Sequence, residues 1–177
     1  VEKRFGRFIA LLNRARAAAS AEAYPADACI LCERTKEKGR EGLTHEWRNY
    51  EHWANDYPIV NDHLLLVTKE HEAQGVSEQN LRDWLEHLGE YHDFILFYNH
   101  AGAGASATAH RHAQLIPSTH VLPVEAAATR LLGERGGVTV SELTDWPAEG
   151  LVLEGRDVRA LASLQSQLLV RLEAYGV

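Results

Sequence analysis

The sequence predicts an α+β protein in which helices pack on a mostly antiparallel sheet of about five strands. Two short apolar runs, residues 63–68 (HLLLVT) and 94–98 (FILFY), have the length and composition of buried strands. Two longer segments, residues 77–88 and 157–172, instead repeat apolar residues at the spacing of one helix face. Because strands and helices follow one another in a mixed order, we expect α+β rather than a parallel sheet.

The N-terminal segment is predicted to form a helix over residues 3–22. Its side chains Phe5, Phe8 and Ile9 fall on one helical face, and the pattern stops before Pro25. We therefore expect an amphipathic helix ahead of the main sheet.

The core of the domain is predicted over residues 28–117. Within it, we expect an edge strand over residues 47–53, a turn over residues 55–58 and a strand over residues 109–117. That last strand ends at a proline, which cannot donate to a strand ladder. Ser77 is placed to cap the helix that follows it.

A C-terminal extension is predicted over residues 118–177. It should contain a short helix over residues 123–132 and strands over residues 138–143 and 151–154. Asp157 can cap a final helix whose leucines face inward.

Composition limits the classes of function. The chain has 177 residues and a net charge of −7, which disfavours a nucleic-acid polymer as partner. No linker divides it, so we expect a single domain over residues 1–177. No apolar run approaches the roughly 20 residues that span a bilayer, so we expect no membrane association and a cytoplasmic location.

Chemistry is indicated by the segment His110-Arg111-His112-Ala113-Gln114. In a strand, alternate residues share one face, so His110, His112 and Gln114 should project together. A neutral imidazole is a good nucleophile towards phosphorus. Two histidines on one strand are more often structural, and only the wider context favours a site.

That context is a loop of small residues directly before the predicted strand. Gly102 and Gly104 allow close backbone approach, and successive amides of such a loop can hold phosphate oxygens. Asn99 and Ser106 add neutral hydrogen-bonding groups. The joint pattern is therefore typical of a phosphate site beside a histidine nucleophile.

The two cysteines suggest a metal. Cys29 and Cys32 have the C-x-x-C spacing that suits tetrahedral zinc with two further ligands. A local arrangement with His45 and His52 is one alternative, although the gap between those histidines exceeds the usual finger spacing. A reduced thiol pair without metal is the other.

The stretch YNHAGAGASATAHRHAQLIP resembles the histidine-triad superfamily, in particular its transferase branch, which carries H-x-H-x-Q. That branch includes diadenosine tetraphosphate phosphorylases (ATP adenylyltransferases) and galactose-1-phosphate uridylyltransferases. The C-x-x-C pair, the NDYPI segment at residues 55–59 and NDHLLLVTKEH at residues 61–71 also have counterparts there. The resemblance implies a histidine-triad-like fold.

The resemblance also implies site residues and a reaction. The nucleophile would be His112, with Gln114 on the phosphoryl oxygens and Asn55 near the nucleoside. The phosphates would be held by Asn99, Gly102, Gly104 and Ser106. The structural zinc would be bound by Cys29, Cys32, His71 and His110.

We therefore expect a nucleotidyltransferase or nucleoside-polyphosphate phosphorylase that forms a nucleotidyl-His112 intermediate on a nucleotide or nucleotide sugar. The alternatives are a dinucleoside polyphosphate hydrolase of the same fold, a non-catalytic nucleotide-binding module and a zinc-stabilised interaction domain. Dimers are common in the resembled family, so a homodimer is a further expectation.

Overall fold

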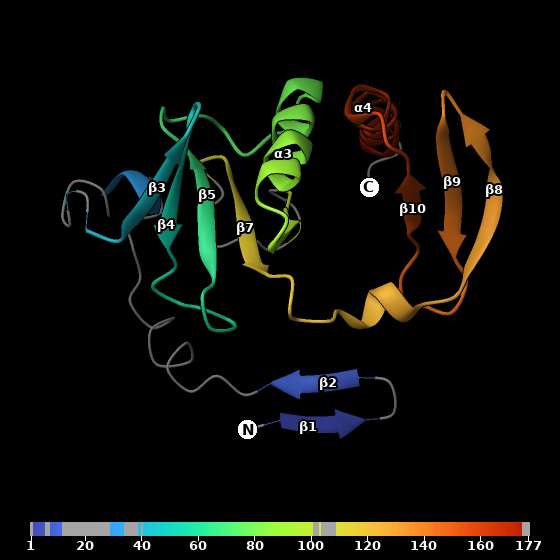
Figure 1. Cartoon of the computed structure of the whole chain (residues 1–177), viewed down its shortest axis with the longest axis horizontal. Coiled ribbons are helices and arrows are strands. Elements are labelled where there is room, and N and C mark those ends of the chain that lie inside the picture. The colour runs from blue at the N-terminus through green and yellow to red at the C-terminus, as the bar shows by residue number, and fades with distance from the viewer. Residues whose placement is uncertain are drawn as a thin grey trace. The chain divides into compact units, whose positions relative to one another are not determined.

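The computed structural model describes residues 2–5, 8–11, 29–33, 39, 41–100, 103 and 109–174 (Figure 1). The chain divides into two compact units. Unit 1 comprises Val1–Gly75 and Asp93–His120, and unit 2 comprises Val76–His92 and Val121–Val177. That residues 1–177 fold as one domain stays a prediction.

A five-stranded antiparallel sheet forms the centre of unit 1, in the order β3-β4-β5-β7-β6 (Figure 1). Its strands are β3 (Leu43–Trp47), β4 (Tyr50–Ala54), β5 (Leu64–Thr68), β6 (Phe94–Phe97) and β7 (His112–Pro117). This sheet confirms the predicted α+β class and its mostly antiparallel character.

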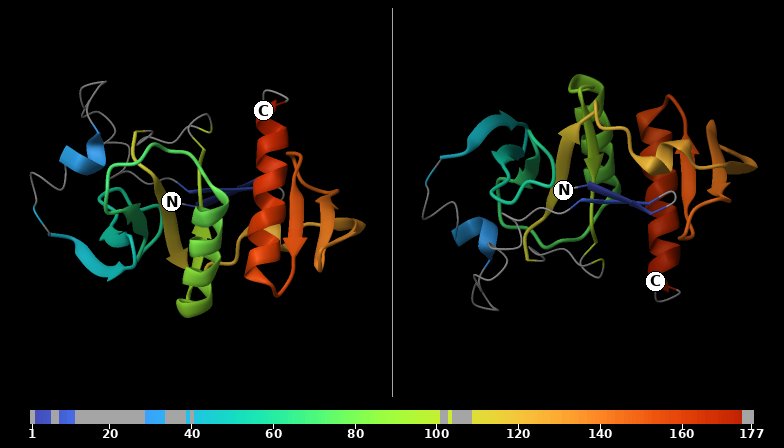
Figure 2. Two further views of the ribbon diagram at one scale, coloured as in Figure 1. Left: turned by 90° about the horizontal axis from the view of Figure 1, so that it is seen from above. Right: turned by 90° about the horizontal axis from the view of Figure 1, so that it is seen from below.

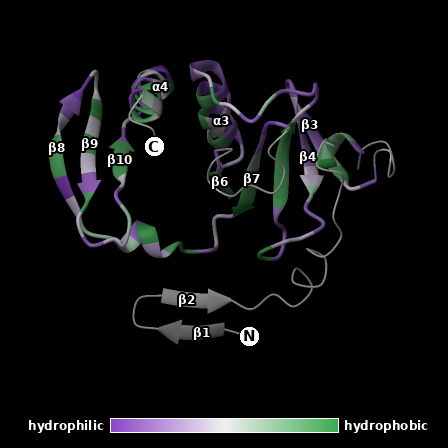
Figure 3. Ribbon diagram, turned by 180° about the vertical axis from the view of Figure 1, so that it is seen from behind, coloured by the Kyte–Doolittle hydropathy of each residue, from purple (hydrophilic) through white to green (hydrophobic). Residues whose placement is uncertain are grey.

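Two of the three inner strands of this sheet, β5 and β7, carry much of its core. Leu66, Ala113 and Leu115 lie on one face and are fully buried. Figure 3 shows the apolar colour that dominates β7. The opposite face carries a second buried cluster, formed by Leu31, Trp53, Leu65 and Val67. Both faces are therefore apolar, as a continuous apolar run in an inner strand predicts.

The edge of the sheet differs from the prediction of one strand over residues 47–53. The chain instead turns back within that range, and Trp47 pairs with Tyr50 across the turn. Arg48 adopts a positive φ of 50°, and its guanidinium lies 4.3 Å from the centre of the Trp47 ring. The contact between cation and ring covers the apolar face of Trp47 at the turn.

The helix predicted over residues 3–22 is wrong for the part of that range that the structure describes. Two antiparallel strands, β1 (Glu2–Phe5) and β2 (Phe8–Leu11), form a hairpin instead. Aromatic and β-branched residues favour strands, and a glycine between them disfavours a helix, which explains the difference. Residues 12–28 lie outside the described part of the chain.

Unit 2 combines two helices with a three-stranded antiparallel sheet in the order β10-β9-β8. The strands are β8 (Thr129–Arg135), β9 (Val138–Leu143) and β10 (Leu151–Glu154), and the helices are α3 (Glu78–Glu90) and α4 (Val158–Ala174). The views in Figure 2 show α4 beside β9 and β10, and α3 packs against α4. The strands over residues 138–143 and 151–154 are confirmed.

The caps of both helices follow the prediction. The Ser77 side chain accepts a hydrogen bond from the Asn80 amide at 3.2 Å, and Asp157 accepts one from the Arg159 amide at 2.8 Å. Side-chain oxygens at these positions satisfy amides that have no partner within the helix.

The helix predicted over residues 123–132 is wrong. A single 3-10 turn, η2, covers Pro123–Ala126, and β8 begins at Thr129. Gly136 and Gly137, both with positive φ, form the tight turn that pairs β8 with β9. Pairing across this turn outweighs the local helical preference. Among the helices of the described ranges, none is long and apolar enough to cross a membrane.

Candidate active site and metal centre

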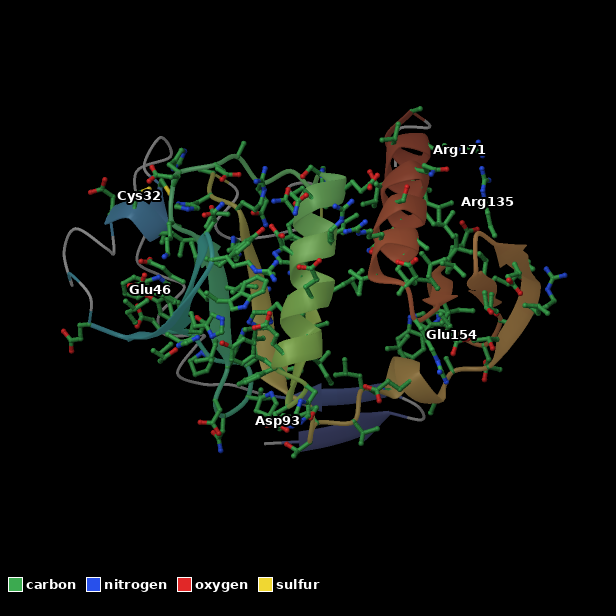
Figure 4. The ribbon with its side chains drawn as sticks, turned by 45° about the horizontal axis from the view of Figure 1, so that its top comes forward. Cys32, Glu46, Asp93, Arg135, Glu154 and Arg171 are labelled. Carbon is green, nitrogen blue, oxygen red and sulfur yellow. The ribbon has the colours of Figure 1, made fainter. Side chains whose placement is uncertain are left out.

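Four side chains from three separate segments meet at one end of the five-stranded sheet. Cys29 directly precedes a helical turn over residues 30–33, Cys32 lies within that turn, His71 follows β5, and His110 precedes β7. Their ligand atoms all lie within 4.8 Å of one another. Figure 4 labels Cys32 on that helical turn, with its sulfur in yellow. The predicted Cys2His2 set is therefore assembled in space.

The helical turn explains how both thiols reach the same point. The Glu33 amide donates to the Cys29 carbonyl at 2.9 Å, and residues three apart in a helix share one side. The Cys32 amide also donates to the Cys29 sulfur at 3.4 Å. The sequence pattern gave no sign of this helical turn.

The imidazole of His110 is oriented by the backbone. Its Nε2 lies 2.9 Å from the Thr68 carbonyl oxygen, which can only accept, so Nε2 carries the proton. Nδ1 is then left with its lone pair, 3.5 Å from the Cys29 sulfur and 3.4 Å from the Cys32 sulfur. Burial, together with the charges of His71 and His112, lowers the pKa of His110 and favours its neutral form. A ligating histidine held by a backbone carbonyl is a common arrangement in metal sites.

The distances fit a tetrahedral ion. For metal–sulfur bonds of about 2.3 Å and metal–nitrogen bonds of about 2.0 Å, a tetrahedron has sulfur–nitrogen edges of about 3.5 Å. The three recorded sulfur–nitrogen distances run from 3.3 to 3.5 Å, including that from Cys32 to His71. The donor set and its spacing therefore suit a single metal ion.

The alternative metal site, in which His45 and His52 would join the two cysteines, does not form among the described residues. These two histidines pair across β3 and β4, with ring centres 5.3 Å apart. Of the residues that the structure describes, only Cys29, Cys32, His71 and His110 form a group suited to a metal.

His112, the predicted nucleophile, begins β7 and is 8% exposed. Its Nδ1 lies 2.9 Å from the His110 carbonyl oxygen, so Nδ1 carries the proton and Nε2 keeps a lone pair. Burial lowers the pKa of His112, although the hydrogen bond to His110 opposes the shift. A neutral imidazole with a fixed tautomer is the state that nucleophilic attack requires.

The strand predicted over residues 109–117 begins later than expected, at His112. Alternation therefore aligns His112 with Gln114, while His110 lies before the strand and faces the metal cluster instead. The reason is that the Arg111 amide donates to the Glu72 carbonyl at 2.7 Å, outside the sheet ladder. That His110 shares this face stays a prediction: it lies before the strand, and it lines a cleft together with Val67, which pairs with His112.

The face of the sheet that carries His112 also carries a cleft. Directly paired residues in antiparallel strands share a face, and Glu51, Val67 and His112 form one such row. The next row contains Trp53 and Gln114. A cleft of about 250 Å³ lies beside the metal cluster, and its lining includes Glu51, Trp53 and Val67 of these rows, but neither His112 nor Gln114, together with Cys32 and His110.

The remaining predicted site residues have different outcomes. Asn99 follows β6, and its carbonyl accepts a hydrogen bond from Gln74 at 3.0 Å. Gly102, Gly104 and Ser106 lie outside the described part of the chain. Their roles at the phosphates stay predictions.

Asn55 occupies a turn after β4. Its side-chain oxygen accepts the Tyr57 amide at 3.0 Å, and its amide nitrogen lies 3.3 Å from the ring of the buried His63. These contacts define a structural part for Asn55 in holding the turn. Its predicted contact with a nucleoside stays a prediction.

Sequence reasoning missed the residues that brace the start of β7. The Arg111 guanidinium forms an ion pair with Glu72 and donates from Nε to the Gly75 carbonyl at 2.7 Å. The Gln74 side chain bonds to both backbone groups of His112. Glu72, Gln74 and Gly75 belong to no motif singled out in the sequence, and Arg111 occupies an unspecified position of H-x-H-x-Q.

Comparison with known proteins adds one finding. A family model described as "Domain of unknown function (DUF4922)" matches residues 9–117. No curated protein and no solved structure matches the chain. The matched range contains the whole metal cluster, His112 and Gln114.

Proposed function

Since the chain belongs to the DUF4922 family, whose description names no activity, we propose, from the resemblance of residues 98–117 to the histidine-triad transferases together with the geometry of the site, that it transfers nucleotidyl groups through a covalent intermediate on His112. One observation carries the proposal. The Nδ1–H of the buried His112 is bonded to a backbone carbonyl, which leaves the Nε2 lone pair available on the face that holds the cleft.

The reaction follows from this tautomer. Nε2 attacks the α-phosphorus of a nucleoside polyphosphate or nucleotide sugar, and the bond between that phosphorus and the leaving oxygen breaks. The leaving group departs with the electron pair, and a nucleotidyl-His112 remains. An acceptor oxygen from phosphate or a sugar phosphate then attacks the phosphorus, the nitrogen–phosphorus bond breaks, and the imidazole is restored. Throughout the reaction Nδ1 keeps its proton and donates it in a hydrogen bond to the His110 carbonyl.

Gln114 favours transfer over hydrolysis. It lies on the same face as His112, two residues along β7, where its amide can donate to phosphoryl oxygens. An amide has no titratable proton, so it is poorly suited to protonating a leaving group. Hydrolysis by the same histidine is the second candidate, and a nucleotide-binding module without turnover is the third.

The cleft gives room for the rest of the substrate. Trp53 and Val67 offer apolar surface there, while Glu51 accepts a hydrogen bond from the Trp53 indole at 3.0 Å. An apolar wall with a few polar groups is typical of small-molecule sites. We assign the nucleoside part to this cleft and the phosphates to the neighbourhood of His112 and Asn99.

We assign zinc to Cys29, Cys32, His71 and His110. Two thiolates and two imidazoles make a closed tetrahedral set, which is the signature of a structural rather than a catalytic ion. Its contribution would be to fasten residues 29–33 beside β7. His110, as a ligand, would take no part in proton transfer.

The test is intact-mass spectrometry after incubation with a panel of nucleoside polyphosphates and nucleotide sugars. We expect a mass increase of one nucleotidyl group, stable in base and lost in acid, as a phosphoramidate behaves. His112→Ala should abolish the increase, while His92→Ala, at an exposed histidine outside the site, should retain it. An adduct that survives in His112→Ala would refute the proposal.

A second arm separates the candidates. With diadenosine tetraphosphate as substrate, ADP that forms only when inorganic phosphate is present means phosphorolysis. ADP or AMP formed without phosphate means hydrolysis. Binding without any adduct or turnover would favour the non-catalytic module.

A further inference from the structure

Gln74 occupies an unusual place in the sheet of unit 1. Strand β6 ends at Phe97, which pairs with Gln114 of β7. The backbone of His112 therefore extends beyond the end of β6 and has no strand partner on that side. The Gln74 side chain, which is 5% exposed, fills this position.

The contacts of Gln74 replace those of a strand residue. Its Oε1 accepts a hydrogen bond from the His112 amide at 3.0 Å, and its Nε2 donates to the His112 carbonyl at 3.3 Å. Two residues paired in an antiparallel ladder exchange the same two bonds. One side-chain amide thus satisfies both backbone groups of the proposed nucleophile.

The same amide also reaches the chain beyond β6. Its Nε2 donates to the Asn99 carbonyl at 3.0 Å, so it bridges Asn99 and His112. In a continued ladder these two residues would pair directly. The inserted side chain of Gln74 instead lies between these two residues and links their backbones.

We infer that Gln74 is a positioning residue for the reaction of His112. It fixes the backbone of His112, and with it the hydrogen bond from Nδ1 to the His110 carbonyl that selects the tautomer. It also fixes the spacing between His112 and Asn99. The inference rests on the proposed function for its catalytic consequence, but the effect on the imidazole can be measured without turnover.

The test compares Gln74→Met, which keeps the length and removes all three bonds, with Gln74→Glu, which keeps only an acceptor for the His112 amide. Gln79→Met is the matched control, because Gln79 is exposed on α3 and bonds only to Asp83 among the recorded contacts. Imidazole nitrogen NMR reports the tautomer of His112, and the signals are assigned by their loss in His112→Ala.

We expect the Nδ1–H signals of His112 to shift or split in both Gln74 variants and to stay unchanged in the control. The rate of adduct formation should fall at least tenfold, whereas the substrate concentration at half-maximal rate should change by less than about threefold. If Gln74→Met does not fold, the same measurements on Gln74→Glu decide the role of Gln74.

Unchanged His112 signals in a folded Gln74 variant would overturn the inference, whatever the rate does. So would a rate of adduct formation within twofold of the parent. If the parent protein forms no adduct at all, the proposed function fails by itself, and the imidazole signals still decide the role of Gln74.

Discussion

Lowering the pH should destabilise the protein through one buried histidine outside the candidate site. His52 lies in β4, is 3% exposed, and pairs with His45 on one side and Leu66 on the other. Burial, and to a lesser extent the charge of His45, lowers the pKa of His52 to about 4 from 6.5. Between about pH 4 and pH 6.5, His52 is therefore mostly neutral in the folded protein and mostly protonated in the unfolded chain.

The sign and size follow from linkage. Between the two pKa values the unfolded state binds more protons, so the free energy of unfolding falls as the pH falls. The loss begins near pH 6.5, reaches about 2 kcal/mol at pH 5 and approaches about 3 kcal/mol near pH 4. Below that, both states are protonated and the loss attributable to His52 stops growing.

Urea unfolding at several pH values tests this prediction. His52→Leu removes the titration while filling similar space, so the difference in unfolding free energy between parent and variant should change by about 2 kcal/mol from pH 7.5 to pH 5. His45→Gln should weaken the dependence of the unfolding free energy on pH, and His92→Leu should leave that dependence unchanged. If that difference is the same at both pH values, the argument from burial is refuted.

Three shorter predictions concern the metal centre, the brace of β7 and the cap of α3. Cys32→Ser should reduce bound metal per chain at least tenfold by elemental analysis and lower the melting temperature, and undiminished metal would exclude the assigned ligand set. Arg111→Lys should cost about 1–2 kcal/mol in urea unfolding, because an ammonium cannot reproduce the planar fork that reaches both Glu72 and the Gly75 carbonyl; an unchanged midpoint would contradict this. Ser77→Ala should cost about 1 kcal/mol of unfolding free energy, and a loss below a few tenths would show that the cap contributes little.

The elements that could be predicted from the sequence have strong local signals. The runs at residues 63–68 and 94–98 are short, continuous and apolar, and both become strands of the central sheet. Ser77 and Asp157 each stand before a helical stripe, and both cap a helix. Pattern and final structure agree for β5, which has a strongly buried face, whereas β6 is half-buried along its whole length at the edge of the sheet, and the expectation that it is buried is wrong.

The elements that were predicted wrongly lack such a face. Strand β8 has exposed residues along most of its length, including Leu131 and Leu132, so no alternation marked it as a strand. Pairing with β9 stabilises β8 as a strand, although its local sequence does not favour one. The strands β1 and β2 likewise depend on pairing between two short segments.

The metal-ligand cluster of the candidate site was predictable from the sequence, and the residues that support His112 were not. That His112 is the nucleophile stays a prediction. C-x-x-C and H-x-H are local spacing patterns, which can be recognised in the sequence before the fold is known. The role of Gln74 arises only because β6 stops at Phe97, two pairs short of His112, and a single glutamine in a polar segment gives no sign of that. Supports of this kind become visible only in three dimensions.

The chain distances within the metal cluster have a consequence for assembly. Cys32 lies 39 positions from His71 and 78 from His110, so the four ligands cannot be neighbours in an unfolded chain. Any ion held by all four closes two long loops at once, which removes freedom mainly from the unfolded ensemble. A cobalt ion bound by these four ligands would therefore develop its tetrahedral absorbance only after β5 and β7 had paired. The absorbance would report when that pairing occurs during folding.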